Sequence, residues 1–571
     1  MAAWLSACLG HPWPVGLTRG LLLVVGLEAA RRLALGALRA WQSDPTWQGS
    51  RILLLLLGAS LFVRWVGISH EVGERFYLDE GTYVNRAQRA NAGELLQTRF
   101  AYPHLLYYLY AFAFWIADQW RFLLEPWVRW LVGSLEGAVF NRLIGRVVAA
   151  AVAAAAVWPS FRLGERLAGR WAATAAGVLM VAAPLFNRDA HVLISDVPSA
   201  TLAGFCLLAL LRLDREAGKE PLGPYAVAGF FAGLAAATKY PAGVVAVAIV
   251  GEWSIRRWRK RNWSWGLPLA GAVAIAAFVG AMPSLLVHWR TAWTSDQGLL
   301  FGLRQYGGGG WFGVVRQSDA LYYLGELRDN WGWTALMLGA LGVAILIVRR
   351  QPALPAMAIF PLVYFVLICS MSMSVSRNLH PILIPLSAFV GAGLVTLGNA
   401  CMARLWGRWP VGARRLRVLV VLGALLPPVV STGFQSASYA RPGTRVLARQ
   451  WIEANLPEGS VLVRESYTPT FKQSRIVVRE APHRFLSNFP LSDLQAQGVD
   501  YVLVSSGAFG RYFKDDLVAA TERPEDARRY YETVFREFEK VAEWKPSLIR
   551  DGPHVLLYRA PWAENEEGPG D

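Results

Sequence analysis

Charged residues and cysteines are both scarce in this sequence. Asp, Glu, Lys and Arg together make up 17% of its 571 residues, whereas hydrophobic residues make up 54%. Because a soluble domain is about a quarter charged, this composition argues against a soluble enzyme, a fibre and a disordered chain. The four cysteines include no CxxC pair, so neither a disulfide framework nor a cysteine-based metal site is expected.

Common catalytic motifs are missing as well. The sequence contains no P-loop, no HExxH zinc motif and no GxSxG nucleophile motif with plausible partners. Its eight histidines are scattered, which does not favour a zinc cluster. No cofactor is therefore expected to be required, although a divalent cation held between Asp79 and Asp196 stays open.

The net charge of +16 comes from short basic clusters that alternate with apolar runs. Six clusters occur, in residues 31–51, 162–170, 212–219, 256–261, 349–350 and 404–417. Since no basic domain stands apart, nucleic acid is not expected as a partner. The pattern is instead the positive-inside distribution of a polytopic membrane protein, with all six clusters cytoplasmic and membrane lipids as its surroundings.

A membrane-spanning helix needs about 20 mostly apolar residues. Eleven segments are candidates: 51–68, 142–160, 171–187, 198–212, 223–238, 240–254, 266–288, 331–348, 354–373, 379–398 and 416–433. The basic clusters fall at every second boundary between them. The alternate boundaries, together with residues 434–571, are therefore expected on the outer face.

Two other apolar stretches do not fit this count. If residues 104–122 spanned the membrane, every later basic cluster would change sides. Their many Tyr and Trp residues instead predict a helix in the outer interface. Residues 17–41 mix Leu and Val with Arg and Glu, which predicts an amphipathic interfacial helix on the inner face.

The predicted fold is mostly α: a polytopic bundle of about 11 transmembrane helices plus interfacial helices, with a small exported α/β domain. The expected parts are an inner segment (1–50), a catalytic transmembrane domain (51–433), the α/β domain (434–562) and a disordered tail (563–571). Within the α/β domain, strands are predicted at 460–466, 474–480, 499–506 and 554–560, and a helix at 530–544.

Two neighbouring carboxylates, Asp79 and Glu80, follow the first predicted span. Adjacent residues on a helix point about 100° apart, so the two cannot form one dyad. One can face a cavity as a general base while the other turns to Arg75, Arg86 or solvent. The alternative is that both simply favour the first turn of a solvated helix.

The second outer loop, residues 187–198, is short and dense in polar groups. Ionisable side chains beside a membrane are costly, so Asp196 and His191 are candidates for function. The alternatives are that Asp196 or Ser195 caps the helix that Pro198 helps to start, and that His191 is only interfacial.

Cations stand at two further outer turns. Lys239 lies in the sequence ATKYP, and Arg377 and His380 lie in RNLHP. Since basic residues normally belong on the inner face, these could hold a lipid phosphate. Snorkelling to the headgroups is the alternative for Lys239. Arg64 and Arg304 are weaker candidates.

The order of these features resembles that of a known family. A first span is followed by YLDEGTYV, an aromatic interfacial helix, HVLISDVP, an ATKY turn and RNLHPILIPL. This order is similar to the GT-C superfamily of integral-membrane glycosyltransferases. Within it, the branch of protein O-mannosyltransferases, lipid A aminoarabinose transferases and lipopolysaccharide-core sugar transferases looks most similar, over roughly residues 50–400.

The resemblance implies transfer of a hexose or pentose from a polyprenyl-phosphate-linked donor to a hydroxyl of an envelope glycan, lipid or protein. The reaction would take place at the outer face of a bacterial inner membrane. The family's first acidic motif matches Asp79 and Glu80, with Asp79 as the base, and its second-loop acid matches Asp196. Inversion is expected from a single displacement.

Substrate binding in such an enzyme would fall to Lys239, Arg377 and His380 around the leaving phosphate, with Tyr83 and His191 as further candidates. The sequence departs from the family before the interfacial helix. Many members have a basic residue and two prolines there, where this chain has AYPH at 101–104. The contact made by that basic residue would require His104 to substitute.

Two other classes stay open. A transporter or flippase of lipid-linked sugars would also have many spans, although no matching halves are visible. A polysaccharide polymerase or ligase would centre on Arg and His in a large outer loop. Residues 289–330, with Arg290, Arg304 and Arg316, are such a loop.

Overall fold

The computed structural model describes most of the chain. The described residues are 47–74, 78–132, 136–213, 221–260, 263–295, 298–300, 314–371, 373–405, 410–471, 475–514, 517–519 and 523–563. The helix expected at 17–41, the weaker candidate Arg304 and the tail beyond residue 563 lie outside them.

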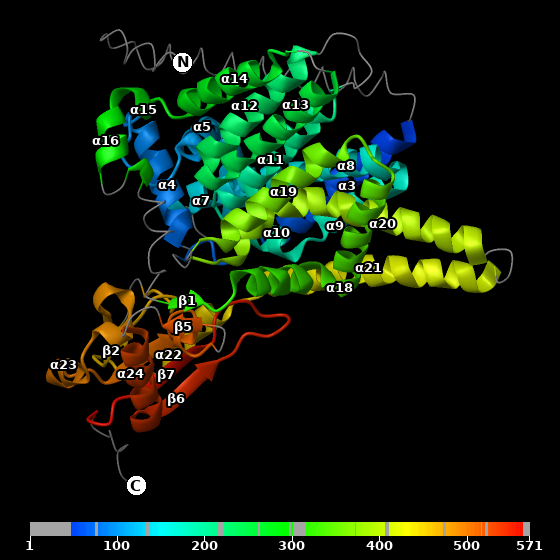
Figure 1. Cartoon of the computed structure of the whole chain (residues 1–571). Coiled ribbons are helices and arrows are strands. Elements are labelled where there is room, and N and C mark those ends of the chain that lie inside the picture. Colours follow the sequence, from blue (N-terminus) through cyan, green and yellow to red (C-terminus); the bar gives the residue numbers. More distant parts are fainter. Residues whose placement is uncertain are drawn as a thin grey trace.

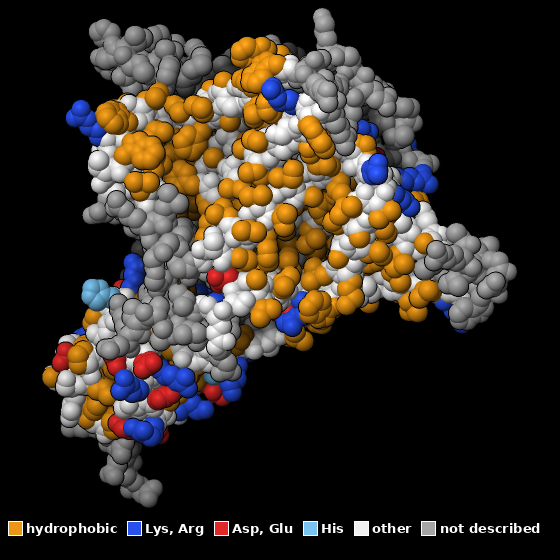
Figure 2. Space-filling model, in the orientation of Figure 1, with side chains coloured by type: hydrophobic (Ala, Val, Ile, Leu, Met, Phe, Trp, Pro, Cys, Tyr) orange, Lys and Arg blue, Asp and Glu red, His pale blue; other side chains and the backbone are white. Residues whose placement is uncertain are grey.

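A helical body and a small C-terminal domain make up the described chain (Figure 1). The main helices of the body are α3 (Trp47–Trp65), α7 (Gly137–Ala155), α8 (Val157–Ala168), α9 (Arg170–Val181), α11 (Asp196–Leu210), α12 (Leu222–Thr238), α13 (Ala246–Lys260), α14 (Gly266–Ala281), α18 (Asp319–Val348), α19 (Leu354–Cys369), α20 (His380–Leu405) and α21 (Pro410–Tyr439). Figure 2 shows hydrophobic side chains over the visible face of this body, while charged side chains crowd the C-terminal domain. The predicted mostly helical fold with a small C-terminal sheet is confirmed.

Four described helical segments are long and apolar enough to cross a membrane: Gly137–Ala168, Asp319–Val348, Ser376–Ala400 and Arg415–Asn455. Five shorter helices are also apolar: α9, α11, α12, α14 and α19. The chain is therefore that of a membrane protein. The number of eleven spans stays a prediction, because several of these helices are shorter than a full crossing.

Some predicted spans are interrupted at prolines. The span predicted at 266–288 ends at Ala281, just before Pro283, and the short helices α15 (Ser284–Val287) and α16 (Trp289–Thr294) follow. A second break separates α9 from α10 (Pro184–Asp189), and the 3-10 turn η1 (Tyr240–Val245) precedes α13. Proline lacks a backbone N–H and clashes with the preceding turn, so these breaks follow from the sequence.

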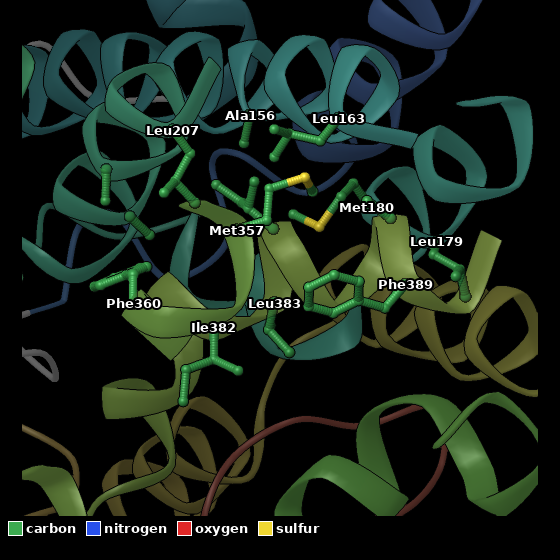
Figure 3. Packing of buried hydrophobic residues seen from close by; sticks show 14 of the residues in the cluster. Ala156, Leu163, Leu179, Met180, Leu207, Met357, Phe360, Ile382, Leu383 and Phe389 are labelled. Carbon is green, nitrogen blue, oxygen red and sulfur yellow. The ribbon is translucent and has the colours of Figure 1, made fainter. Parts of the chain in front are cut away.

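Close packing of side chains joins the helices of the body. One buried cluster contains side chains from three helices: Met180 of α9, Met357 and Phe360 of α19, and Phe389 of α20 (Figure 3). Methionine fills irregular spaces between such helices because its side chain is flexible.

Helices α12 and α14 touch backbone to backbone. A Cβ atom at Gly229 or Gly233 would overlap the backbone of Ala270 or Ala274. This small-residue spacing of four lets two helices approach closely, which matters where lipid supplies no hydrophobic drive for association.

Three helices form the first outer loop: α4 (Leu78–Asn91), α5 (Leu105–Gln119) and α6 (Arg121–Val132). α5 buries Tyr107, Tyr110 and Phe114 against α4 and α7. Its 15 residues rise about 22 Å, which is less than a hydrocarbon core of about 30 Å. The interfacial position of residues 104–122 stays a prediction.

The C-terminal domain contains a five-stranded sheet of order β3-β2-β4-β7-β6. The strands are β2 (Val461–Arg464), β3 (Val477–Glu480), β4 (Tyr501–Ser505), β6 (Glu539–Trp544) and β7 (Val555–Arg559). The four predicted strand segments contain β2, β3, β4 and β7. The helix predicted at 530–544 is wrong in its second half, because α24 (Arg523–Glu537) ends and β6 pairs antiparallel with β7. Cross-strand pairing there overrides local preference.

The domain is fastened to the first outer loop by buried ion pairs. Arg445 of α22 (Thr444–Asn455) donates to Glu71 Oε2 at 2.9 Å, and Arg449, one turn later, pairs with Glu74. A second connection is the antiparallel pair of β1 (Val314–Arg316), from the body, with β5 (Leu517–Ala519). Since Glu74 stands shortly before Asp79, the domain helps to fix the start of the helix that carries the predicted base.

A buried carboxyl makes the stability of the C-terminal domain depend on pH. Glu465 accepts bonds from Tyr531 Oη (2.5 Å) and from the Ser505 (2.8 Å) and Leu486 (3.2 Å) amides. Burial nevertheless raises its pKa from 4.5 to about 7. The folded domain then binds the proton more tightly than the unfolded chain does. The contribution of Glu465 to the free energy of unfolding is complete below pH 4.5. About 3 kcal/mol of it is lost as the pH rises to 7.

Hydrogen exchange of the β2 and β4 amides in the full chain measures this effect. Protection should fall between pH 5 and about 7 after correction for intrinsic exchange, and Glu465→Gln should flatten the profile. An unchanged slope in Glu465→Gln would assign the pH dependence to another group.

Candidate active site

Four segments that were predicted to lie on the outer face bring opposite charges together in an alternating row. Arg377 Nη1 donates to Asp79 Oδ2 at 2.7 Å, and its Nε lies 4.0 Å from Asp196 Oδ2. Lys239 Nζ donates to Asp196 Oδ1 at 2.5 Å and to Asn378 Oδ1 at 3.1 Å. The row Asp79–Arg377–Asp196–Lys239 joins the residues that the sequence singled out in separate loops.

The placement of these residues at helix ends explains their meeting. Asp79 is in the first turn of α4 and Asp196 is the first residue of α11. Lys239 follows the end of α12, and Arg377 lies in the 3-10 turn η3 (Ser376–Leu379) before α20. Helices that end at one face of a bundle deliver their terminal residues to the same region. The N-terminal positions of the acids also suit the helix dipole.

Exposure separates the two neighbouring carboxylates. The side chain of Asp79 is 33% exposed, whereas that of Glu80 is 2% exposed. Glu80 forms a bidentate pair with Arg146 of α7 at 2.7 and 2.9 Å, and Arg142 lies 3.6 Å away. The expectation that the second acid turns to Arg75, Arg86 or solvent was therefore wrong.

Two arginines of α7 also hold the backbone before α4. Arg146 Nη1 donates to His70 O at 2.6 Å, and Arg142 Nη1 donates to Glu74 O at 2.9 Å and to Val72 O. A buried carboxylate that makes a bidentate pair with an arginine is held in a fixed geometry. The Glu80–Arg146 pair therefore fixes the N-terminal end of α4, so Glu80 supports the position of Asp79.

His380 contacts the backbone of Arg377 and the side chain of Asp189. Its Nδ1 lies 2.5 Å from Arg377 O, and its Nε2 lies 3.3 Å from Asp189 Oδ2. Asp189 in turn accepts two bonds from Arg188, at 2.7 and 3.0 Å. The sequence did not single out Asp189, although its place in the polar second loop was the available signal.

His191 lies outside the charged row. Its Nδ1 is 2.7 Å from Asn187 O and its Nε2 is 2.9 Å from Val66 O, and its ring packs on Tyr439. Burial lowers its pKa to about 4. His191 therefore connects the second loop to the residues that follow the first span.

His104 is also buried and neutral. It stacks between Phe100 and Tyr107, its Nε2 lies 3.0 Å from Arg99 O, and burial lowers its pKa to about 4. It does not supply the cation that the family's basic residue would supply. Tyr83 is buried on α4 one turn after Asp79, and burial raises its pKa.

The arrangement of the acids does not suggest a metal centre. In the described ranges, no group of three or more His, Cys, Asp or Glu residues is placed to hold a metal ion. Asp79 and Asp196 face Arg377 between them. Arg64, a weaker candidate, is buried and donates to Met180 O at 3.0 Å.

No curated protein matches the sequence. The family of dolichyl-phosphate-mannose-protein mannosyltransferases matches residues 121–286, a part that contains Asp196 and Lys239 but neither Asp79 nor Arg377.

Solved structures share the fold over most of the chain. An oligosaccharyltransferase from Archaeoglobus fulgidus in its apo form is 14% identical, with 85% of this chain and 73% of that chain covered and a TM-score of 0.54. The same archaeal enzyme with an inhibitory peptide and a dolichol-phosphate is 12% identical, with coverages of 92% and 75% and a TM-score of 0.53. The chain therefore shares its fold with this archaeal oligosaccharyltransferase.

ArnT from Cupriavidus metallidurans in the apo state is 15% identical, with 90% of this chain and 99% of that chain covered and a TM-score of 0.49. The family model and the archaeal structures confirm the predicted resemblance to GT-C enzymes. The roles of individual residues stay predictions that rest on the geometry above.

Proposed function

We propose that this chain transfers a sugar from a polyprenyl-phosphate-linked donor to an acceptor hydroxyl at the outer face of the membrane. The observation that carries the proposal is the row Asp79–Arg377–Asp196–Lys239, in which the partly exposed Asp79 pairs with Arg377 and a second cation, Lys239, pairs with Asp196. The bound dolichol-phosphate in the archaeal relative supports a lipid phosphate as the leaving group.

Asp79 acts as the general base. The acceptor oxygen gives its proton to Asp79 as it attacks the anomeric carbon, and the bond from that carbon to the phosphate oxygen breaks. The electron pair leaves with the polyprenyl phosphate, so the anomeric centre inverts in one displacement. Of the two neighbouring acids, only Asp79 is exposed enough to meet a substrate.

Arg377 and Lys239 stabilise the departing phosphate. Without substrate, each of them is neutralised by a carboxylate, Arg377 by Asp79 and Lys239 by Asp196. A phosphate that binds Arg377 competes with Asp79 for it and frees the carboxylate to accept a proton. Donor binding therefore prepares the base, and the cations balance the charge that grows on the phosphate in the transition state.

Supporting residues keep this row in place. Glu80 anchors α4, His380 and Asp189 lie behind Arg377, and Asn378 contacts Lys239. The acceptor is an envelope glycan, lipid or protein. The enzyme lies in a bacterial inner membrane with its C-terminal domain exported, as the positive-inside pattern predicts. No cofactor is required.

Mass spectrometry of envelope glycans tests the proposal. The strains are a deletion and the deletion complemented with the wild type, with Asp79→Asn or with Glu94→Gln at equal protein level. Glu94 is an exposed acid of the same loop that forms an ion pair with Arg89. One glycan should lose one sugar in the deletion, and Asp79→Asn should fail to restore it while Glu94→Gln restores it. Full restoration by Asp79→Asn would point instead to Asp196 or to transport of a lipid-linked sugar.

A further inference from the structure

A second group of polar side chains, Arg86, Arg99, His104 and Tyr107, lies further along the first outer loop, between α4 and α5. None of the four belongs to the charged row. Within the described chain, neither arginine has a carboxylate at ion-pair distance: Arg86 Nη1 donates only to Gln97 Oε1 at 3.4 Å, and the Arg99 guanidinium lies over the Tyr102 ring at 5.8 Å. Both cations are half-buried without a counter-ion.

Buried polar atoms without partners surround these cations. In the described structure, Arg99 Nε, His104 Nδ1 and Tyr107 Oη are all shielded from solvent and make no hydrogen bond. The side chains of His104 and Tyr107 are fully buried. Because His104 Nε2 faces Arg99 O and must carry the proton, its Nδ1 is a free acceptor. Leaving such atoms unpaired costs about 1–3 kcal/mol each, which a ligand recovers by bonding to them.

The four groups share one neighbourhood. The Arg99 carbonyl contacts His104, and the His104 ring stacks on the Tyr107 ring at 5.4 Å. The Tyr107 ring packs 5.6 Å from that of Tyr83, which is on the same helix as Arg86. Burial lowers the pKa of Arg86, and the positive charges of Arg89 and Arg99 lower it further. Two like charges held close together favour a bound anion.

Position favours an anion other than the leaving phosphate. Arg86 is seven positions after Asp79, a rise of about 10 Å along α4. The reacting atoms must lie about 3 Å apart, so the leaving phosphate belongs beside Asp79 and Arg377. The anion at Arg86 and Arg99 is therefore assigned to a second group of the substrate.

We propose that Arg86 and Arg99, with Tyr107 and His104, bind an anionic group, a phosphate or a carboxylate, of the glycan substrate. The arginines take the anion, and His104 Nδ1 and Tyr107 Oη take neighbouring hydroxyls. The inference deepens the proposed function, because it defines the substrate as an anionic glycan. The anion is on the acceptor or on the transferred sugar.

The binding test uses inorganic phosphate and the purified full chain, followed by ³¹P NMR line broadening. Arg86→Gln combined with Arg99→Gln should weaken phosphate binding about tenfold or more, since charge-assisted bonds are lost. The matched control is Arg129→Gln, which changes an exposed arginine of α6 and should leave phosphate binding within about twofold. Lysine at both positions should keep most of the binding and report on folding.

Unchanged binding in the double glutamine variant, or no binding by the wild type, would overturn the inference. This titration involves no sugar transfer, so it stands if the proposed transfer fails. The source of the anion is read from the glycan that the deletion strain truncates. If the sugar that is missing from the truncated glycan is acidic, the anion belongs to the donor. If the terminal residue of the truncated glycan is acidic, the anion belongs to the acceptor. If neither of these two sugars is acidic, the inference is also overturned.

Discussion

Replacing Asp79 by asparagine should lower the rate of sugar transfer by about 10³- to 10⁴-fold, because an amide cannot accept the acceptor's proton. Asparagine keeps the size of the side chain and one oxygen for Arg377, so folding should be preserved. The loss should appear in kcat, since the proton moves in the transition state and the donor contacts remain. Donor turnover by purified protein in lipid nanodiscs measures the effect.

Two control variants show whether the loss of rate is specific to the carboxylate of Asp79. Glu94→Gln removes an exposed acid of the same outer loop and should leave the rate within about twofold. Asp79→Glu keeps the base but moves it, and should retain more activity than Asp79→Asn. If Asp79→Asn kept more than about a tenth of the wild-type rate, Asp79 would not be the base.

Replacing Arg377 by glutamine should lower kcat/KM by about 10³-fold, because the leaving phosphate loses its closest cation. Arg377 is the one residue of the row that contacts both acids, Asp79 at 2.7 Å and Asp196 at 4.0 Å. Arg377→Lys keeps the charge but not the planar fork and should recover part of the loss. The measurement is steady-state donor turnover at several donor concentrations.

A structural explanation for the Arg377 effect can be separated from an electrostatic one. Arg441, an exposed arginine after α21, gives a matched Arg→Gln control that should leave turnover unchanged. Loss of a merely structural contact would lower the unfolding temperature along with the rate. An Arg377→Gln protein with wild-type kcat/KM would contradict the role in leaving-group stabilisation.

The members of the charged row could be singled out from the sequence because they follow or adjoin apolar runs. Asp196, Lys239 and Arg377 lie within two residues of predicted spans, and Asp79 comes eleven positions after the first span. The alternation of basic clusters puts all four on one side of the membrane. Topology alone therefore brings them to one surface, and the structure adds which atoms meet.

Other contacts could not be predicted because they join distant positions inside helices. Glu80 pairs with Arg146, which lies 66 residues away within a segment that reads as an apolar span. Burial of His104 lowers its pKa to about 4, and the sequence alone does not show that burial. In the C-terminal domain, residues 539–544 have a helical pattern, but pairing with β7 decides their structure.

The most direct test of the central claim is the amount of polyprenyl-phosphate-linked sugar in membrane lipids, measured by liquid chromatography and mass spectrometry. The lipids come from the deletion strain complemented with the wild type or with Asp79→Asn at equal protein level. One such lipid should accumulate in the Asp79→Asn strain and stay low with the wild type, because the donor is made but not consumed. Equal levels of every polyprenyl-phosphate-linked sugar in the two strains would contradict the account.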